Sequence, residues 1–274
     1  MTVIIDGKKI SLKIKEKLKQ EIANLKNKPT LAVIQIGNNE ASNSYIRAKE
    51  KVAQEIGINF IHLKYLEDIE EQIIINKINE LNMNKDITGI IIQLPIPKKF
   101  NTNKIINNIH PTKDVDGLTY KNIGKLIQDI PSLISCTPKG IMRLLDEYKI
   151  DIKGKNIVVV GRSNLVGKPI AQLLLNRDAT VTVCHSHTKN LSFYTKQADI
   201  LIVAVGKKHL ITKDMVKEES VIIEVGINKE DNNLYGDVDF DNVKDIASYI
   251  TPVPGGVGPM TVMMLMENVV KCLK

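Results

Sequence analysis

The sequence has little cysteine and no long apolar run, and each shortage excludes a class of protein. The three cysteines, Cys136, Cys184 and Cys272, are far apart and form no Cys-x-x-Cys pair, so we expect a reducing compartment rather than a disulfide framework or a zinc site. The longest apolar stretches, such as residues 200–205, are as long as strands and fall short of the roughly 18 residues of a membrane helix. The N-terminal apolar run stops at Asp6, too early for a signal-peptide core. These features predict a cytoplasmic protein without a membrane segment.

Length and charge narrow the class further. The 274 residues suggest two domains, and 43% apolar with 25% charged residues is ordinary for a globular protein. The 38 basic and 31 acidic residues give a net charge of +7, which would suit an acidic partner or a polyanionic small molecule. The alternative is a general abundance of lysine, because the lysines are scattered and no basic block contains interleaved aromatics. We therefore expect no nucleic-acid partner.

Strand-like and helix-like segments alternate along most of the chain. The first half predicts a βαβαβ series, which implies a parallel sheet covered on both faces; its segments are a strand at 30–37, a helix at 39–56 ending at Gly57, a strand at 59–66, a helix at 69–81 and a strand at 87–94. Residues 110–138 interrupt the pattern with loop chemistry and mark the domain hinge. The second half predicts helices at 139–149, 165–176 and 260–273, and strands at 155–161, 180–184, 199–206 and 220–226.

A glycine turn in the second half is a candidate phosphate site. The segment GRSNLVG (161–167) follows a predicted strand and opens a helix, where outward-pointing N–H groups and the helix dipole favour an anion. The middle glycine of Gly-x-Gly-x-x-Gly is Ser163 here. The turn alone therefore also fits a strand–helix connection that binds nothing.

The next strand bears on the choice of cofactor. An NAD site usually has an acidic residue about 20 residues further on, which binds the ribose 2′-hydroxyl. Here the tip of the second strand reads CHSH (184–187), without an acid. Arg162, Ser186 and a histidine can instead hold a 2′-phosphate, which favours NADP. His185 and His187 are also spaced like a metal pair, but zinc needs at least three protein ligands and no third is evident, so no metal is expected.

Four side chains of the first half have the chemistry of a catalytic site. Tyr45 and Lys49 lie four residues apart on a predicted helix and share a face; such a pair suits proton transfer or polarisation, or is a solvated lysine beside a half-buried tyrosine. Gln93 ends the third strand, where α/β sheets bind ligands. Asp116 precedes Gly117 in a loop and can accept hydrogen bonds from a donor-rich heterocycle. Alternatively, Gln93 only caps the strand and Asp116 only forms the turn with Gly117.

Seven motifs occur in a fixed order: SYIRAK (44–49), QLPIP (93–97), KDVDG (113–117), CTP (136–138), GRSNLVG (161–167), CHS (184–186) and TPVPGGVGPMT (251–261). Together they resemble the bifunctional methylenetetrahydrofolate dehydrogenase/cyclohydrolase family over essentially the whole chain. The resemblance implies NADP-dependent oxidation of 5,10-methylenetetrahydrofolate to the methenyl cation, followed by hydrolysis to 10-formyltetrahydrofolate.

The resemblance also implies roles for individual residues. Lys49 would be the central catalytic residue, Gln93 would set its orientation and protonation, Tyr45 would stack on the folate ring and Asp116 would bind the pterin. Further folate contacts would come from Pro252, Gly256 and Val257. The cofactor would be held at its adenosine end by Arg162, Ser163, His185 and Ser186 next to Gly161, and contacted near its reactive end by Ile227.

The implied fold is α/β with two domains and a cleft between them. Residues 1–137 and 251–274 would form the folate-binding catalytic domain, which the C-terminal helix completes. Residues 138–250 would form a Rossmann-like NADP-binding domain, through which two copies would make a homodimer.

Two other classes remain as alternatives. Short-chain dehydrogenases also use Tyr-x-x-x-Lys, but there the glycine turn precedes the pair, whereas Tyr45 comes long before Gly161. A cofactor-binding sensor without catalysis is disfavoured because Tyr45, Lys49, Gln93 and Asp116 are all present.

Overall fold

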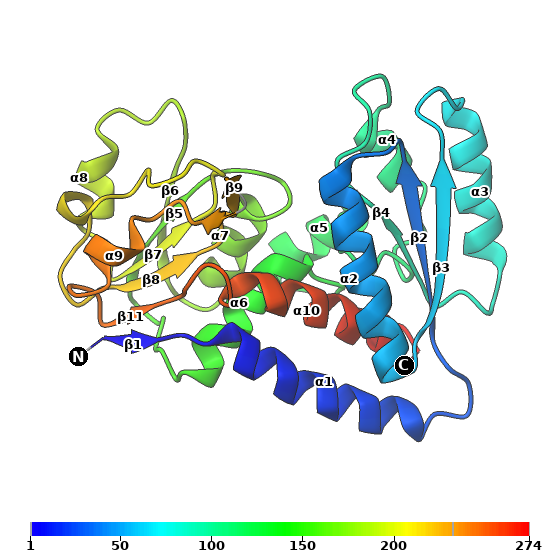
Figure 1. The fold of residues 1–274 in the computed structure, drawn as a ribbon, viewed down its shortest axis with the longest axis horizontal. Coiled ribbons are helices and arrows are strands. Elements are labelled where there is room, and N and C mark those ends of the chain that lie inside the picture. Colours follow the sequence, from blue (N-terminus) through cyan, green and yellow to red (C-terminus); the bar gives the residue numbers. More distant parts are fainter. Residues whose placement is uncertain (1, 232, 274) are drawn as a thin grey trace. The chain divides into compact units, whose positions relative to one another are not determined.

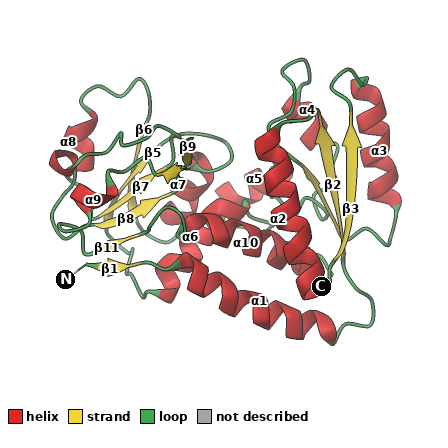
Figure 2. Ribbon diagram, viewed as in Figure 1, coloured by secondary structure: helices red, strands yellow, loops and turns green. Residues whose placement is uncertain are grey.

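The computed structural model describes residues 2–231 and 233–273, and it shows two compact α/β units (Figures 1 and 2). Unit 1 comprises Met1–Leu12 and Thr137–Thr261, and unit 2 comprises Lys13–Cys136 and Val262–Lys274. The predicted α/β class is confirmed. No helix in the described ranges combines the length and the apolar character needed to cross a membrane.

Unit 2 is built on the predicted βαβαβ series. Its three parallel strands have the order β3-β2-β4, and the bounds are β2 (Thr30–Ile36), β3 (Asn59–Tyr65) and β4 (Gly89–Ile92). The connecting helices α2 (Glu40–Ile56) and α3 (Glu71–Met83) lie on opposite sides of these strands (Figure 1). Side chains alternate between the two faces of a strand. Because a helix covers each face, every residue of the central strand β2 is buried.

The face under α3 holds an apolar core. Ala32, Ile34 and Ile36 of β2 pack there with Ile74 and Ile78 of α3, all at most 3% exposed. The short helix α4 (Thr102–Ile106) closes the same core.

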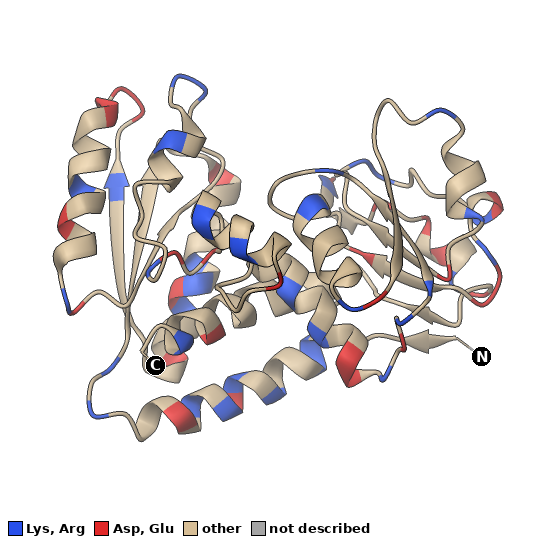
Figure 3. Cartoon of the chain, turned by 180° about the vertical axis from the view of Figure 1, so that it is seen from behind, with Lys and Arg blue, Asp and Glu red and all other residues tan. Residues whose placement is uncertain are grey.

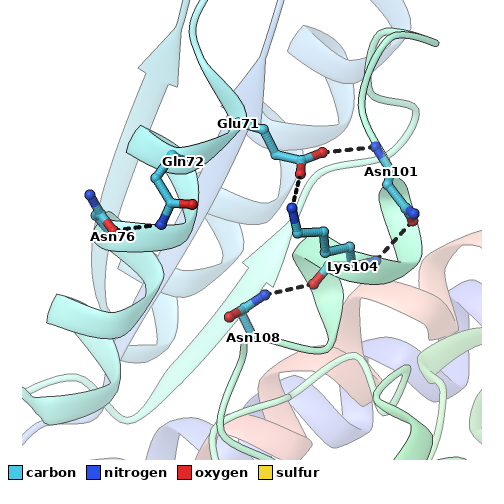
Figure 4. Close-up of polar contacts among 6 residues, drawn as sticks. All are labelled: Glu71, Gln72, Asn76, Asn101, Lys104 and Asn108. Carbon is cyan, nitrogen blue, oxygen red and sulfur yellow. Dashed lines mark hydrogen bonds and ion pairs between the residues drawn. The ribbon is translucent and has the colours of Figure 1, made fainter.

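Polar side chains at the edge of this core connect α4 to α3 by hydrogen bonds. The Glu71 carboxylate accepts the backbone N–H of Asn101 at 3.0 Å and Lys104 Nζ at 2.7 Å, as Figure 4 shows. Asn101 Oδ1 in turn caps α4 by accepting the Lys104 N–H at 3.0 Å. Another short helix of unit 2 is α5 (Tyr120–Ile127).

Both ends of α2 are fixed by the sequence. At its N-terminus, Asn39 Oδ1 accepts the Ser42 N–H at 3.0 Å, which satisfies one of the free donors of the first turn. At its C-terminus, Gly57 takes a left-handed conformation with φ +88°, as helix-ending glycines commonly do. The helix that carries Tyr45 and Lys49 is therefore fixed in length and register.

Unit 1 contains a six-stranded parallel sheet of order β1-β11-β8-β7-β5-β6. Its strands are β1 (Val3–Ile4), β5 (Asn156–Val160), β6 (Thr180–Cys184), β7 (Ile200–Val203), β8 (Val221–Glu224) and β11 (Tyr249–Ile250). The other elements are α6 (Cys136–Glu147), α7 (Gly167–Leu175), α8 (Leu191–Thr195), α9 (Phe240–Val243), the 3-10 turn η1 (Lys213–Met215) and a hairpin of β9 (Asn228–Glu230) and β10 (Asn233–Tyr235).

The compact units differ from the predicted domain division at two places. Residues 3–4 pair with β11, so the start of the chain belongs to the six-stranded sheet of unit 1. Residues 251–261 also belong to unit 1, and only the later part of the last helix, α10 (Val257–Lys271), belongs to unit 2. The first difference arises because residues 3–4 pair with residues 249–250, a backbone pairing that periodicity along the sequence does not report. The assignment of folate and cofactor to the two domains stays a prediction.

A long helix near the N-terminus, α1 (Gly7–Ala23), has no counterpart among the predicted elements. Lysines are frequent on α1, and Figure 3 shows basic and acidic residues dispersed over helices and loops rather than gathered in one block.

Candidate active site

The side chains of Lys49 and Gln93 meet in unit 2. Lys49 lies on α2, one turn after Tyr45, and its Nζ donates a hydrogen bond of 2.9 Å to Gln93 Oε1. Gln93 directly follows β4 and is only 6% exposed. Its amide is held from the other side, because Nε2 donates to the carbonyl of Leu94 at 2.7 Å. Gln93 therefore presents a fixed, uncharged oxygen to the ammonium group.

The environment makes Lys49 a weaker base than an ordinary lysine. Burial lowers the pKa of the Lys49 ammonium, and the acidic groups of Asp116 and Cys136 partly oppose that shift. Burial also raises the pKa of the Asp116 carboxyl, while the charge on Lys49 and a hydrogen bond from Cys136 act in the opposite direction. A lysine and a carboxyl with pKa values displaced toward neutrality are typical of acid–base sites.

The loop that carries Asp116 is anchored to the strand that leads to Gln93. Ile90 of β4 forms a bridge with Asp114, whose buried carboxylate accepts the Thr119 N–H and Asn122 Nδ2, both at 2.8 Å. Asp114 thus holds the loop, while Asp116 is only partly buried and lies in the electrostatic range of Lys49.

A second anchor comes from α10. The buried Asn268 donates to the carbonyls of Val115 and Ile134 at 2.8 and 2.9 Å. Gly117 has φ +68°, and a side chain there would meet the backbone of Ser135 at 2.7 Å. Segments 115–117 and 134–136 are consequently packed backbone to backbone, which brings Cys136 next to Asp116.

In unit 1, the glycine turn has the form of a phosphate-binding turn. Gly161 follows β5 with φ +123°, and a Cβ there would lie 2.4 Å from the Ala204 oxygen. A Cβ on Gly167 would lie 2.2 Å from the Gly161 oxygen. Ser163, in place of a middle glycine, accepts the N–H groups of Val166 and Gly167 on its Oγ at 3.1 and 3.4 Å. A hydroxyl accepts two hydrogen bonds and donates one, so Ser163 can close the turn and still donate to a ligand.

The tip of β6 forms a tight turn beside Arg162. The His185 N–H donates to Thr188 Oγ1 at 2.8 Å, and burial lowers the pKa of His185, with the charge of Arg162 adding to that shift. His185 Nδ1 accepts the His187 N–H at 3.2 Å, so this nitrogen is engaged in the turn. Among the described residues no group of three or more possible metal ligands occurs.

The remaining predicted contacts also lie in unit 1. Ile227 is 42% exposed in the loop after β8, and a Cβ on Gly258 would lie 3.6 Å from its Cδ1. Gly256 donates its N–H to the Pro252 carbonyl at 2.9 Å, and Val257 is 3% exposed. A side chain on Gly7 would collide with the Gly256 oxygen at 1.9 Å, so Gly256 is fixed by backbone packing.

The predicted site residues divide between the two units, and the contacts of the structure join Lys49, Gln93 and Asp116 in one unit and Arg162 and His185 in the other. The unit 2 group is Tyr45, Lys49, Gln93 and Asp116; the unit 1 group is Gly161, Arg162, Ser163, His185, Ser186, Ile227, Pro252, Gly256 and Val257. Sequence reasoning did not assign a role to Cys136 at the site, although CTP (136–138) was noted as a motif, and it missed Asn268. The sequence signal for Asn268 is weak, because it is one of several polar residues in a mostly apolar helix.

A Rossmann-type unit with a glycine turn and a second α/β unit with a lysine–glutamine pair define a dinucleotide-dependent enzyme. Comparison with known proteins identifies the group. Residues 5–116 match the family model "Tetrahydrofolate dehydrogenase/cyclohydrolase, catalytic domain", and residues 135–274 match "Tetrahydrofolate dehydrogenase/cyclohydrolase, NAD(P)-binding domain". The chain belongs to the tetrahydrofolate dehydrogenase/cyclohydrolase family. The resemblance seen in the sequence motifs is thereby confirmed.

Full-length relatives agree with this assignment. "Bifunctional protein FolD" of Thermodesulfovibrio yellowstonii is 53% identical over 275 residues, which cover 99% of this chain and 96% of that protein. The crystal structure of the bifunctional dehydrogenase/cyclohydrolase of Campylobacter jejuni has a TM-score of 0.98 at 45% identity, covering 99% and 98% of the two chains. The Trypanosoma brucei enzyme, solved with NADP cofactor and inhibitor, has a TM-score of 0.95 at 33% identity, covering 99% and 97%.

The lowered pKa of Lys49 can be tested through its neutral partner. In Gln93→Glu a carboxylate replaces the amide oxygen, and an opposite charge at this distance favours the charged ammonium. We expect a higher Lys49 pKa in Gln93→Glu than in the unsubstituted protein, measured by pH-dependent acylation of Lys49 followed by mass spectrometry. Gln54→Glu, on the exposed side of the same helix, is the matched control and should leave the Lys49 pKa in place. Equal Lys49 pKa values in the two variants would contradict the electrostatic account.

Proposed function

We propose that this chain oxidises 5,10-methylenetetrahydrofolate with NADP and then hydrolyses the methenyl product to 10-formyltetrahydrofolate, with Lys49 as the central catalytic residue. The observation that carries the proposal is the 2.9 Å hydrogen bond between Lys49 and Gln93 next to Asp116. Relatives covering nearly all of the chain are named bifunctional, and the trypanosome relative was solved with NADP.

The second reaction is the one that needs proton transfer. Water that attacks a methenyl cation must lose a proton, and the ring nitrogen that leaves the carbon must be stabilised. A lysine whose pKa is lowered by burial exchanges protons more readily near neutral pH. Gln93 orients Nζ without adding a charge, and Asp116 supplies a carboxyl group for the donor-rich pterin. Tyr45, half exposed one turn before Lys49, offers a ring face for stacking.

The glycine turn of unit 1 fits a dinucleotide. Side chains are excluded at Gly161 and Gly167 by the neighbouring backbone, so the turn allows close approach of a pyrophosphate at the start of α7. Arg162 and the Ser186 hydroxyl at the tip of β6 would hold the 2′-phosphate of NADP, and His185 would contact the same end. When bound, NADP supplies the hydride acceptor of the first reaction; the protein binds and orients the two partners.

Replacement of Lys49 tests its role in hydrolysis. We expect Lys49→Ala to lose about 10²- to 10⁴-fold in methenyltetrahydrofolate hydrolysis, the usual contribution of a positioned acid–base group. Decay of methenyltetrahydrofolate absorbance measures it. Lys51→Ala, an exposed lysine on the same helix, is the matched control, and NADPH binding should be retained in both variants. Near-normal hydrolysis by Lys49→Ala would remove Lys49 from the mechanism.

Replacement of Arg162 tests the choice of cofactor. We expect Arg162→Ala to weaken NADPH binding about 10- to 100-fold, the range for a lost hydrogen bond to a charged group, and to leave NADH binding nearly unchanged. Fluorescence titration with each reduced cofactor measures the two affinities. Arg177→Ala, which removes only a surface ion pair with Asp146, should change neither. An equal loss for both cofactors would place Arg162 away from the 2′-phosphate.

We also propose that the protein is a cytoplasmic homodimer that associates through unit 1. The three cysteines, all within the described ranges, are not joined in disulfides, which fits a reducing compartment. Strand β6 is an edge of the six-stranded sheet, and Val183 on it is 38% exposed. Phe193 and Leu175 in the same unit are 59% and 56% exposed, so this unit offers apolar surface for a second copy.

The dimer predicts a mass of twice 30.6 kDa in solution, measured by light scattering after size exclusion. Val183→Lys should shift the population toward single chains, because it places a charge on the edge strand. Leu66→Lys, at a 76% exposed position of unit 2, should remain dimeric. A single-chain mass for the unsubstituted protein at micromolar concentration would refute the homodimer.

A further inference from the structure

Two buried acidic side chains lie at the C-terminal ends of strands β7 and β8 in unit 1. Asp237 is completely buried and Glu224, the last residue of β8, is 3% exposed. Neither belongs to the predicted sites. A buried carboxyl group is costly unless hydrogen bonds compensate for the lost water, so the partners of these two residues show what they hold.

Asp237 fixes the loops that follow two neighbouring strands. Its Oδ2 accepts the N–H groups of Val205 and Gly206 at 2.7 and 2.9 Å, in the loop after β7. Its Oδ1 accepts the Lys207 N–H at 2.7 Å and Asn228 Nδ2 at 2.9 Å, and Asn228 belongs to the segment after β8. Both oxygens are therefore engaged, and one side chain joins the two loops.

Glu224 continues the same arrangement. Its carboxyl oxygens accept the Gly226 N–H at 2.9 Å and the Val238 N–H. Its backbone is tied to Thr251, since the Glu224 N–H donates to Thr251 Oγ1 at 2.7 Å and this hydroxyl donates to the Glu224 carbonyl at 3.3 Å. Glu224 thus links the loop after β8 to the start of the segment TPVPGG.

The glycines around the two carboxyl groups leave no room for other side chains. A Cβ on Gly226 would lie 2.2 Å from the Asp237 carboxyl group, and a Cβ on Gly236 would lie 2.3 Å from Glu224 Oε2. The backbone at Gly226, in the loop after β8, and at Gly236, directly after β10, therefore packs against the two carboxyl groups. Ile227 lies between Gly226, whose N–H donates to Glu224, and Asn228, whose side chain donates to Asp237, so the two acids hold the chain on both sides of it.

We propose that Asp237, with Glu224 beside it, is a positioning residue for the reactive end of the dinucleotide: it fixes the loops after β7 and β8, and with them Ile227, in the form that receives the cofactor. Ligands of parallel α/β sheets bind beyond the carboxyl ends of the strands, where these loops lie. The proposal rests on the proposed cofactor site, because it takes Ile227 to be a cofactor contact. Neither acid contacts the cofactor in this account.

The charge on the pair adds a pH dependence. Burial raises the pKa of Glu224 to about 8, and the negative charge of Asp237 adds to that shift. The other titratable groups around Glu224 line the same cavity of about 240 Å³ and are His209, Tyr235, Asp239 and Asp241. Below about pH 8 most Glu224 carboxyl groups are protonated and carry no charge. Above about pH 8 the ionised Glu224 carboxylate and the negative charge of Asp237 repel each other within the loops. We therefore expect the affinity for the cofactor to fall as the pH rises.

The two activities of one chain allow a direct test with Asp237→Asn. The amide keeps the shape of the carboxylate but offers one accepting oxygen in place of two, and it turns a donor toward backbone N–H groups. We expect the Kd for NADPH to rise about tenfold or more, with dehydrogenase activity reduced, while methenyltetrahydrofolate hydrolysis stays within about twofold. Asp245→Asn, at an exposed position of the same unit, is the matched control.

A parallel loss of both activities in Asp237→Asn would overturn the proposal, because it would show a general structural role. Unchanged NADPH affinity in this variant would also overturn it, because it would show that Asp237 has no role at the cofactor site. Arg162→Ala tests the cofactor site separately: if that variant binds NADPH normally, the site prediction fails whatever Asp237→Asn does. For Glu224, NADPH affinity should fall between pH 7 and 9 in the unsubstituted protein and vary less in Glu224→Gln. The same pH dependence in both proteins would exclude Glu224 from the arrangement.

Discussion

The hydrogen bond from Lys49 to Gln93 is the interaction on which the catalytic group depends. It joins a helix to the end of a strand, and it depends on the strand order β3-β2-β4 and on the helix α2 that Asn39 and Gly57 cap. The loop of Asp116 is then tied to β4 through the bridge from Ile90 to Asp114. The partly desolvated ammonium group, with its lowered pKa, is thus a product of the sheet order and not of any one residue.

Much of this arrangement follows from local signals in the sequence. Apolar runs such as TLAVIQIG, with helix-forming segments between them, predicted the strands and helices of the βαβαβ series to within a few residues. The long helix α1 was missed, although Ile10, Ile14, Leu18 and Ile22 are spaced four apart and are all buried. The apolar spacing of a helix is present, but the many lysines between the apolar residues make it hard to recognise. The strand before this helix has only two residues, which is too short to give a pattern.

Contacts between distant residues were beyond the reach of the sequence. The pairing of β1 with β11 joins residues near the two ends of the chain, and Asn268 reaches the carbonyls of Val115 and Ile134 from the last helix. The same holds for Asp237 and Glu224, whose partners, apart from the Asn228 side chain, are backbone N–H groups that any residue can supply. Glycines next to these acids, at 226 and 236, mark where backbone approaches a carboxyl group, but only the structure shows which group it is.

The most direct test of the account is to follow both reactions on one purified preparation. Methylenetetrahydrofolate is mixed with NADP or with NAD and the reduced cofactor is recorded; separately, the decay of supplied methenyltetrahydrofolate is recorded without any cofactor. The account predicts NADPH formation that exceeds NADH formation, together with accelerated methenyl decay. A folded protein that is inactive in both assays would contradict it and would favour a cofactor-binding protein without catalysis.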